Sequence, residues 1–227
     1  RNERACPDLL WKIIETKRRR QGKPPAYYAV LMLDGDRMGK WLRARSGAEH
    51  QRAISRALAG FALDLVGPAV DEAGQGTLIY SGGDDVLALL PTAPSLRCAQ
   101  RIRDAFTENW RHNMAREPMA TVSAGLVIAH FKEDLRFVMN EARRAEKKAK
   151  EAGRDALQIT VCRRSGEQTT ALCPWEFVET VCGWGDAFLP RDGGAAASDR
   201  WAYHLYGELP TLEGVPVEAM RAEIRRQ

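Results

Sequence analysis

A short glycine-rich turn between two apolar runs constrains the fold of this chain more than any other feature. The runs are residues 77–80 and 86–90, and Ser81-Gly82-Gly83-Asp84-Asp85 joins them. Two strand-length runs with such a turn between them predict a β-hairpin. The glycines let a ligand approach the backbone, and adjacent carboxylates repel each other unless a cation lies beside them. A solvated turn would also contain Gly and Asp, so the turn alone leaves both interpretations open.

A second pair of acids, Asp34 and Asp36, follows an apolar, strand-length run at residues 27–33. Helix-like sequence begins at about Arg37. Folds that mix strands and helices bind ligands at such carboxyl ends of strands. In a split βαβ arrangement the first strand lies antiparallel beside the second hairpin strand, so Asp34 is expected to meet Asp84 and Asp85. Three carboxylates at one point would suit a two-metal site, with Mg²⁺ favoured by all-oxygen ligands.

The periodicity of the remaining chain predicts helices and strands in a βαββαβ order with a further αβ unit. The expected helices are residues 38–45, 48–73, 95–112 and 134–152, and the expected later strands are 120–129 and 156–162. This order predicts an α+β sandwich of the ferredoxin-like, palm type. Residues 1–25 suggest a short amphipathic helix that ends at a double proline, as a linker or the end of a preceding domain.

The long helix at residues 134–152 is rich in charge and is followed by Arg154. Glu–Lys pairs at helical spacing explain part of this pattern as ordinary surface design. If the helix lies beside the first strand, however, Lys150 and Arg154 would reach phosphates held at the strand end. An ammonium and a guanidinium both suit a triphosphate.

Composition restricts the class of protein but does not indicate an activity. A formal net charge of +4 permits a polyanionic partner without requiring one. No apolar run approaches the length of a membrane span, and the beginning of the chain does not resemble a signal peptide. The five cysteines include no C-x-x-C pair, which favours a reducing cytoplasm over disulfides or structural zinc. The four histidines are scattered and are interpreted as structural or surface residues.

As a set, these motifs resemble the nucleotidyl cyclase palm that GGDEF diguanylate cyclases share with type III CRISPR effector complexes. The resemblance is strongest to the large, polymerase-like subunit of those complexes, in its III-B (Cmr) version. It rests on four stretches within residues 26–167: Tyr27 to Lys40 with Asp34-Gly35-Asp36, the Gly82-Gly83-Asp84-Asp85 turn, Ser123-Ala124-Gly125, and Ala145 to Arg154.

The resemblance implies a metal-dependent nucleotidyltransferase that makes cyclic oligoadenylates from ATP. A ribose 3′-hydroxyl would attack the α-phosphate of another ATP, and pyrophosphate would leave. The implied ligands of Mg²⁺ or Mn²⁺ are Asp34 and Asp84, with Asp85 assisting and the carbonyl of Gly35 contributing. The implied nucleotide contacts are Ser81 with the base or ribose, Gly82 and Gly83 beneath the nucleotide, and Lys150 and Arg154 with the triphosphate.

The resemblance also implies partners and a domain arrangement. The partners are other subunits of a cytoplasmic type III complex with its crRNA and target RNA, and a second palm or another copy, with no membrane. Residues 26–167 would form the palm, and residues 168–227 a mostly helical segment that begins another domain. The HD nuclease, the zinc-binding region and the first palm of the family have no counterpart in this sequence.

Three alternatives stay open. A diguanylate cyclase-like enzyme would use GTP, although Val86 follows Asp85 where that family has phenylalanine. A non-catalytic scaffold of a ribonucleoprotein would bind ATP without releasing pyrophosphate. A template-directed polymerase would need primer and template elements that the sequence does not show.

Overall fold

The computed structural model of the protein describes residues 25–44, 47–73, 75–114, 119–188, 196–198, 200–212 and 214–226. The helix expected in residues 1–25 lies, except for Pro25, outside these ranges. The chain forms two compact units, one that ends at Val178 and one that begins at Glu179. The first unit contains a six-stranded sheet, and the second consists of helices where the structure describes it.

The sheet has the strand order β2-β3-β1-β4-β5-β6. Its strands are β1 (Tyr27–Gly35), β2 (Thr77–Gly82), β3 (Asp85–Pro91), β4 (Val122–His130), β5 (Ala156–Cys162) and β6 (Gln168–Pro174). β4 and β5 are parallel, and all other neighbours are antiparallel. The predicted βαββαβ order with an added αβ unit is confirmed, and β1 lies antiparallel beside β3, the second strand of the hairpin.

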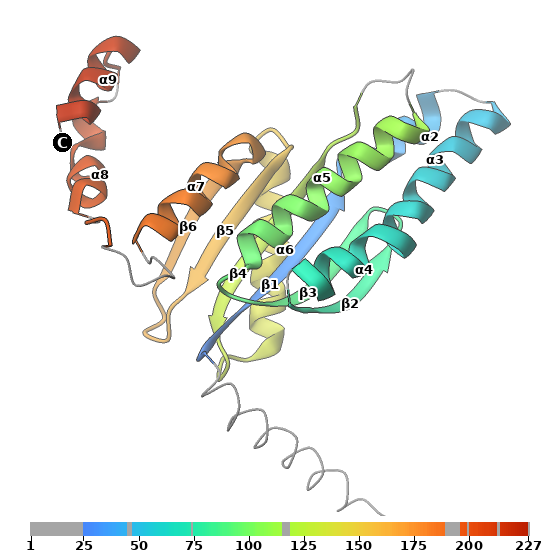
Figure 1. Ribbon diagram of the computed structural model, residues 1–227, viewed down its shortest axis with the longest axis horizontal. Helices are drawn as coiled ribbons and strands as arrows, with labels where there is room; N and C mark the ends of the chain where they lie inside the picture. Colours follow the sequence, from blue (N-terminus) through green and yellow to red (C-terminus); the bar gives the residue numbers. More distant parts are fainter. Residues whose placement is uncertain are drawn as a thin grey trace, which may run out of the picture. The chain divides into compact units, whose positions relative to one another are not determined.

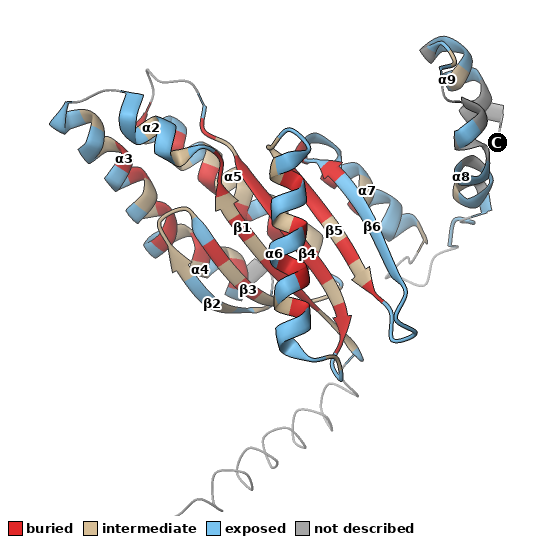
Figure 2. Ribbon diagram, turned by 180° about the vertical axis from the view of Figure 1, so that it is seen from behind, coloured by how far each residue is buried: buried red, intermediate tan, exposed pale blue. Residues whose placement is uncertain are grey.

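Helices cover both faces of this sheet. α3 (Ala48–Gly60) and α5 (Ser95–Asn113) lie over one face, and α6 (Leu135–Glu151) lies over the other (Figures 1 and 2). On the α6 side a buried apolar cluster joins the two layers: Val30, Val127, Ala129, Val138, Ala142, Ala145 and Cys162. Because side chains alternate along a strand, the even-numbered residues of β1 face α6, and Asp34 is one of them.

The helix that follows α2 (Met38–Ala44) is long and irregular. α3 continues through two short π-helical stretches, Phe61–Leu65 and Ala69–Ala73, that flank α4 (Val66–Pro68). By length and composition alone, Ala48–Asp71 is the one helical stretch of the described chain that could cross a membrane. The sequence analysis expected no such run. Phe61 is fully buried and meets the Phe106 ring edge-on at 5.1 Å, so we interpret the stretch as a packing layer of the first unit.

The last strand, β6, was not predicted, since residues 168–174 were assigned to the mostly helical segment. β6 pairs along its whole length with β5. The chain then enters α7 (Trp175–Phe188), where Trp175 is 2% exposed and its indole N–H donates a hydrogen bond of 2.8 Å to the carbonyl of Val122. The first unit thus extends to Val178, beyond the expected palm boundary at residue 167.

The second unit contains two further helices, within the segment that was expected to be mostly helical. They are α8 (Arg200–Leu212), which has Pro210 inside it, and α9 (Val217–Arg226). Tyr203 and Tyr206 of α8 are exposed.

Candidate functional site

Three segments that are far apart in the sequence meet at the carboxyl end of β1. The register pairs Leu33 with Val86, which brings Asp34 beside Asp85 at the start of β3. α6 packs against β1, and its last turn carries Lys150 to the same point. A cavity of about 490 Å³ lies here, lined by Met32, Leu33, Asp34, Tyr80, Asp85, Val86, Leu87, Arg143, Glu146 and Lys150.

The Lys150 ammonium lies between two carboxylates. It donates a hydrogen bond to Oδ2 of Asp34, and Oε1 of Glu146, one helical turn earlier, is 2.6 Å from Nζ. The side chains of Asp34, Lys150 and Glu146 are 29%, 26% and 18% exposed. Burial lowers the pKa of Lys150, and the charge of Arg154 lowers it further. The two carboxylates therefore stabilise an ammonium that its surroundings otherwise disfavour.

Gly125 allows α6 to approach the sheet this closely. A Cβ atom at Gly125 would lie 2.5 Å from the carbonyl oxygen of Ala142 and 2.5 Å from the backbone nitrogen of Glu146. Only glycine fits at such a contact. Gly125 is also the partner of Met32 in the β1–β4 register. The contact therefore fixes α6 over β1, and with it the position of Lys150 at the strand end.

Asp84 lies against the last residue of β1. A Cβ atom at Gly35 would lie 2.5 Å from Oδ2 of Asp84, so a side chain at this position would collide with the carboxylate. The backbone N–H of Gly35 donates a hydrogen bond to Asp84. Gly83 turns the chain with a φ of 70°, in the left-handed region that glycine adopts readily. The hairpin turn and the end of β1 are thus in direct contact.

Burial raises the pKa of three acids near this point, Asp84, Asp85 and Glu146. For Asp84 burial is the largest cause, and the charge of Asp85 adds to it, while N–H groups of Asp84 and Gly35 lower the pKa. Burial also raises the pKa of Asp85. The pKa of Glu146 is raised by burial and then by Asp85 and Asp36. Negative charge on these groups is therefore costly, and a bound cation would relieve that cost.

The donor types suit Mg²⁺ or Mn²⁺, because these ions prefer carboxylate oxygens. In the described ranges, however, no three Asp, Glu, His or Cys side chains lie close enough together to hold a metal ion. The expected cluster of Asp34, Asp84 and Asp85 is not formed, because Asp34 is paired with Lys150 and Asp84 is bonded to the Gly35 N–H. The chemistry of the acids fits a divalent cation, whereas their arrangement in this structure does not.

Asp36 lies outside this group. It is 3% exposed and accepts hydrogen bonds from Thr121 Oγ1 at 2.7 Å, from Ser123 Oγ at 2.8 Å and from the backbone N–H of Asp155 at 3.1 Å. Its carboxylate therefore joins the end of β1 to β4 and to the turn before β5. Asp36 was not among the predicted ligands. Alternation along an extended strand would place it on the same face as Asp34, but β1 ends at Gly35, so Asp36 lies beyond the strand.

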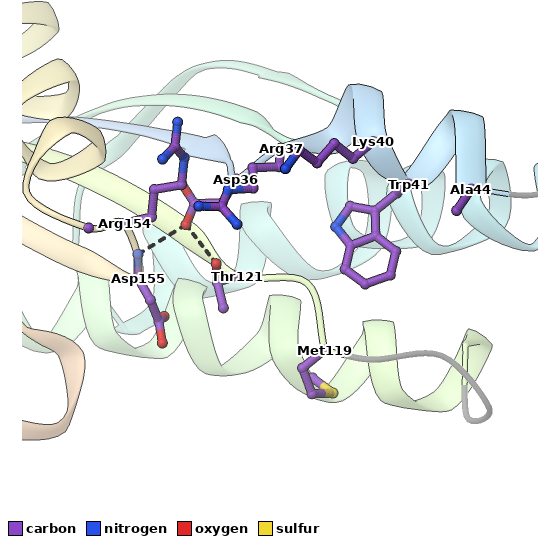
Figure 3. A pocket seen from close by; sticks show the side chains of 10 residues that line it. Asp36, Arg37, Lys40, Trp41, Ala44, Met119, Thr121, Arg154 and Asp155 are labelled. Carbon is purple, nitrogen blue, oxygen red and sulfur yellow. Dashed lines mark hydrogen bonds between the residues drawn. The ribbon is translucent and has the colours of Figure 1, made fainter.

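A second cavity, of about 470 Å³, is lined mainly by α2, the residues before β4 and the turn after α6 (Figure 3). Its two acids are engaged, Asp36 as described and Asp155 with Arg103 at 3.5 Å. Within the described part of the chain, no ion pair joins its three cations to a carboxylate. The cavity thus carries excess positive charge and suits an anion. Its residues are Asp36, Arg37, Lys40, Trp41, Ala44, Met119, Thr121, Gly153, Arg154 and Asp155.

The two predicted phosphate-binding residues therefore line different cavities. Lys150 faces the cavity with Asp34, and Arg154 faces the cationic one. The backbone of Arg154 has a φ of 73°, which is unusual for a residue other than Gly or Asn. The turn that holds it follows Gly153 directly.

The remaining predicted nucleotide contacts lie on the hairpin. Oγ of Ser81 is buried and makes no hydrogen bond within the described residues. The Tyr80 ring lies over Gly82, where a Cβ atom would be 2.5 Å from Cζ of Tyr80. A Cβ atom at Gly83 would have no neighbouring atom within 4 Å. Gly83 is thus accessible to a ligand, and Tyr80 covers Gly82.

Glu146 was not predicted as a site residue, although it lines the cavity with Asp34, Asp85 and Lys150. Its spacing from Lys150, four residues along α6, was interpreted as ordinary helix surface pairing. That spacing is the one signal in the sequence that points to it, because it places both side chains on one face of the helix.

Comparisons with known proteins agree with this architecture. Residues 27–158 match the family described as Cas10/Cmr2, second palm domain. The chain is 33% identical over 228 residues to the CRISPR system Cmr subunit Cmr2 of Pyrococcus furiosus. That alignment covers 88% of this chain and 26% of the relative, so the chain spans about a quarter of the relative's length.

Solved structures with this fold include two crystal structures of a Csm1-Csm4 cassette. The cassette in complex with one ATP has a TM-score of 0.59 at 17% identity, and the match covers 86% of this chain and 33% of that one. The cassette in complex with cA4 has a TM-score of 0.57 at 17% identity, over 73% and 25% of the two chains. At this identity the likeness concerns the fold. The family match extends over more than half of the sequence, and the chain therefore belongs to the Cas10/Cmr2 second palm domain family, that of the large subunit of type III CRISPR effector complexes.

Proposed function

We propose that this palm is a nucleotidyltransferase that links ATP molecules into cyclic oligoadenylates within a type III CRISPR effector complex. The observation that carries the proposal is the meeting of Asp34, Asp85 and Lys150 around one cavity at the end of β1, with Asp84 against Gly35. Acids and a lysine at a strand end suit the two charges of a metal–triphosphate complex. The Csm1-Csm4 cassettes bound to ATP and to cA4 support this substrate and product class.

Each side chain has a role in this proposal. Asp34, Asp84 and Asp85 hold Mg²⁺ or Mn²⁺, and the carbonyl of Gly35 contributes. Such an ion would lower the pKa of the attacking 3′-hydroxyl and offset the charge of the leaving pyrophosphate. Ser81, with its unbonded hydroxyl, contacts the base or ribose, and Gly83 admits the nucleotide beside Gly82.

The triphosphate lies between the two cavities in this arrangement. Lys150 binds it from the α6 side, and Arg154 binds it from the cationic cavity, where Arg37 and Lys40 add positive charge. Binding removes the repulsion between Lys150 and Arg154 that lowers the pKa of the lysine. The second palm, the crRNA, the target RNA and a cytoplasmic setting belong to the same proposal, as parts of the complex in which the subunit would act.

The proposal is tested by incubating the chain with ATP and Mn²⁺ and measuring ATP affinity, pyrophosphate release and linked products. Wild type is expected to bind ATP in a metal-dependent way. The double variant Asp84→Ala plus Asp85→Ala is expected to lose product by about 10²-fold or more, because charge stabilisation at the reacting phosphates is lost. Asp64→Asn, on the exposed surface of the long helix, is the matched acid control and should behave as wild type.

The other outcomes identify the rival functions. Preference for GTP over ATP would indicate a diguanylate cyclase-like enzyme. Metal-dependent ATP binding without pyrophosphate release, even when a second palm is supplied, would indicate a scaffold. Unchanged product from the double variant would show that the proposed carboxylates are not the catalytic ones.

A further inference from the structure

The ammonium of Lys150 bridges two carboxylates. It donates a hydrogen bond to Asp34, and Nζ lies 2.6 Å from Oε1 of Glu146, with which it forms an ion pair. Oε1 of Glu146 is inaccessible to solvent, and no other group among the described residues donates a hydrogen bond to it. Lys150 is therefore the one partner that this buried acceptor has in the described part of the chain.

The position of Glu146 is fixed, whereas that of the ammonium is not. The backbone nitrogen of Glu146 packs against Gly125, where α6 and β4 are in direct contact. Lys150 is one turn further along the same face, and its four-carbon stem allows the ammonium to move between neighbouring acceptors. A glutamate placed four residues before a lysine is also the favourable order for an ion pair on a helix.

We propose that Lys150 is an exchangeable counter-ion: its ammonium is shared by Asp34 and Glu146, and it keeps Glu146 alone when Asp34 binds a divalent cation. Glu146 is then a positioning residue that acts through Lys150. The inference rests on the proposed function, because it takes Asp34 to be a metal ligand. It also accounts for the absence of a three-acid ligand set among the described residues, since Asp34 is occupied by Lys150.

The physical reason is the cost of an unpaired charge in a partly buried site. Displaced from Asp34, the ammonium without Glu146 would have no carboxylate partner, and breaking such a pair is strongly unfavourable. With Glu146 present, the ammonium keeps a partner and stays in the cavity, ready for a phosphate. Glu146 therefore favours cation binding at Asp34 indirectly.

A double-mutant cycle on Mn²⁺ affinity tests this without any assay of activity. Mn²⁺ dissociation constants are measured by electron paramagnetic resonance for wild type, Glu146→Gln, Lys150→Met and the double variant. Glu146→Gln is expected to weaken Mn²⁺ binding about 10-fold or more, as loss of a residue that orients a metal ligand does. Lys150→Met is expected to tighten it, because the competing ammonium is gone. In the Lys150→Met background, Glu146→Gln is expected to change the affinity by less than about 3-fold.

The controls separate this inference from the proposed function. Glu151→Gln removes an exposed acid of the same helix and should leave the affinity unchanged, and circular dichroism confirms that each variant is folded. If Glu146→Gln weakens binding equally in both backgrounds, Glu146 acts only as a nearby negative charge and the inference is overturned. If Lys150→Met weakens Mn²⁺ binding, the lysine is not a competitor and the inference fails. If wild type binds no Mn²⁺, or Asp34→Asn binds it as well as wild type, the metal site of the proposed function fails as well.

Discussion

Two aspartates that stand two residues apart at the end of β1 have different partners. Asp34, within the strand, faces α6 and pairs with Lys150. Asp36 lies past the strand end, where its own N–H bonds to the carbonyl of Thr121, and its carboxylate accepts three hydrogen bonds from the β4 and β5 side of the sheet. The two acids of the Asp-x-Asp motif therefore differ in role: Asp34 lines the candidate site, and Asp36 connects β1 to neighbouring parts of the sheet. The difference comes from where the strand stops, which spacing alone does not reveal.

The raised pKa of Asp84 predicts that the ionised carboxylate of this residue destabilises the folded state. A carboxyl group whose pKa is higher in the folded state stabilises the fold below its ordinary pKa of 3.8, and that contribution is lost as the pH rises through the raised value. Asp84→Asn removes the ionisation. We expect Tm at pH 7 to rise by roughly 2 °C, and the gain to disappear below pH 3.8.

The measurement is thermal unfolding from pH 3 to 8 for wild type and Asp84→Asn in buffer with a chelator. Asp64→Asn serves as the exposed control and should leave Tm unchanged. A lower Tm for Asp84→Asn at pH 7 would mean that the hydrogen bond from Gly35 outweighs burial, contrary to the expected sign.

At the scale of elements, contact between α6 and the sheet decides where the site lysine lies. Among the described glycines, Gly125 is the one whose missing side chain makes room for the backbone of Ala142 and Glu146. Gly125→Ala is expected to cost about 1–3 kcal/mol of unfolding free energy, because an added methyl group in a filled contact forces the helix to shift. Urea unfolding measures this, and the same shift should weaken Mn²⁺ or ATP binding.

Gly185→Ala is the matched control for that variant. Gly185 is in α7, and a Cβ atom there would have no neighbour within 4 Å. The substitution should be neutral or slightly stabilising, since it lowers the entropy of the unfolded chain. Equal losses for Gly185→Ala and Gly125→Ala would show that the α6 contact has no special role.

Elements with strong periodicity or clear turn chemistry were predictable from the sequence. The hairpin, the long helices and the first five strands of the sheet follow from apolar spacing, and the split βαβ rule places Asp34 beside Asp85. β6 was missed because Gln168–Pro174 is a mostly exposed edge strand with Thr and Gln in place of an apolar alternation. Its pairing with β5 is a tertiary effect that local sequence does not encode.

Some of the residues that line the cavity at the end of β1 were predictable from the sequence, whereas their pairing was not. Spacing and resemblance identified Lys150 and the acids, and the topology brings Lys150 to Asp34 across more than a hundred residues of sequence. Glu146 was hidden because a charged helix contains many Glu–Lys pairs, and burial alone distinguishes this one. The separation of Lys150 and Arg154 into two cavities depends on the positive φ values of Arg154 and Asp155, which the sequence gives no reason to expect.

At the scale of the whole molecule, the palm domain is proposed to include β6 and the start of α7. The first compact unit ends at Val178, and the side chain of Trp175 is buried with its N–H bonded to β4. A chain that stops after Phe188 is therefore expected to keep a Tm within about 2 °C of that of the full chain. A chain that stops after Glu167 should lose about 3 kcal/mol or more, the usual cost of removing a buried tryptophan.

Thermal and urea unfolding of the two shortened chains make this comparison. Equal stability of both would place the boundary at residue 167, as the sequence first suggested. A severe loss in the longer of the two would show that the palm depends on residues 189–227.

The ion pair between Lys150 and Asp34 has a consequence for how such a domain is made. The ammonium of Lys150 offsets the charge of this carboxylate from within the chain, without a bound ion. If Asp34 binds a metal ion as proposed, folding and ion loading would therefore be separate events.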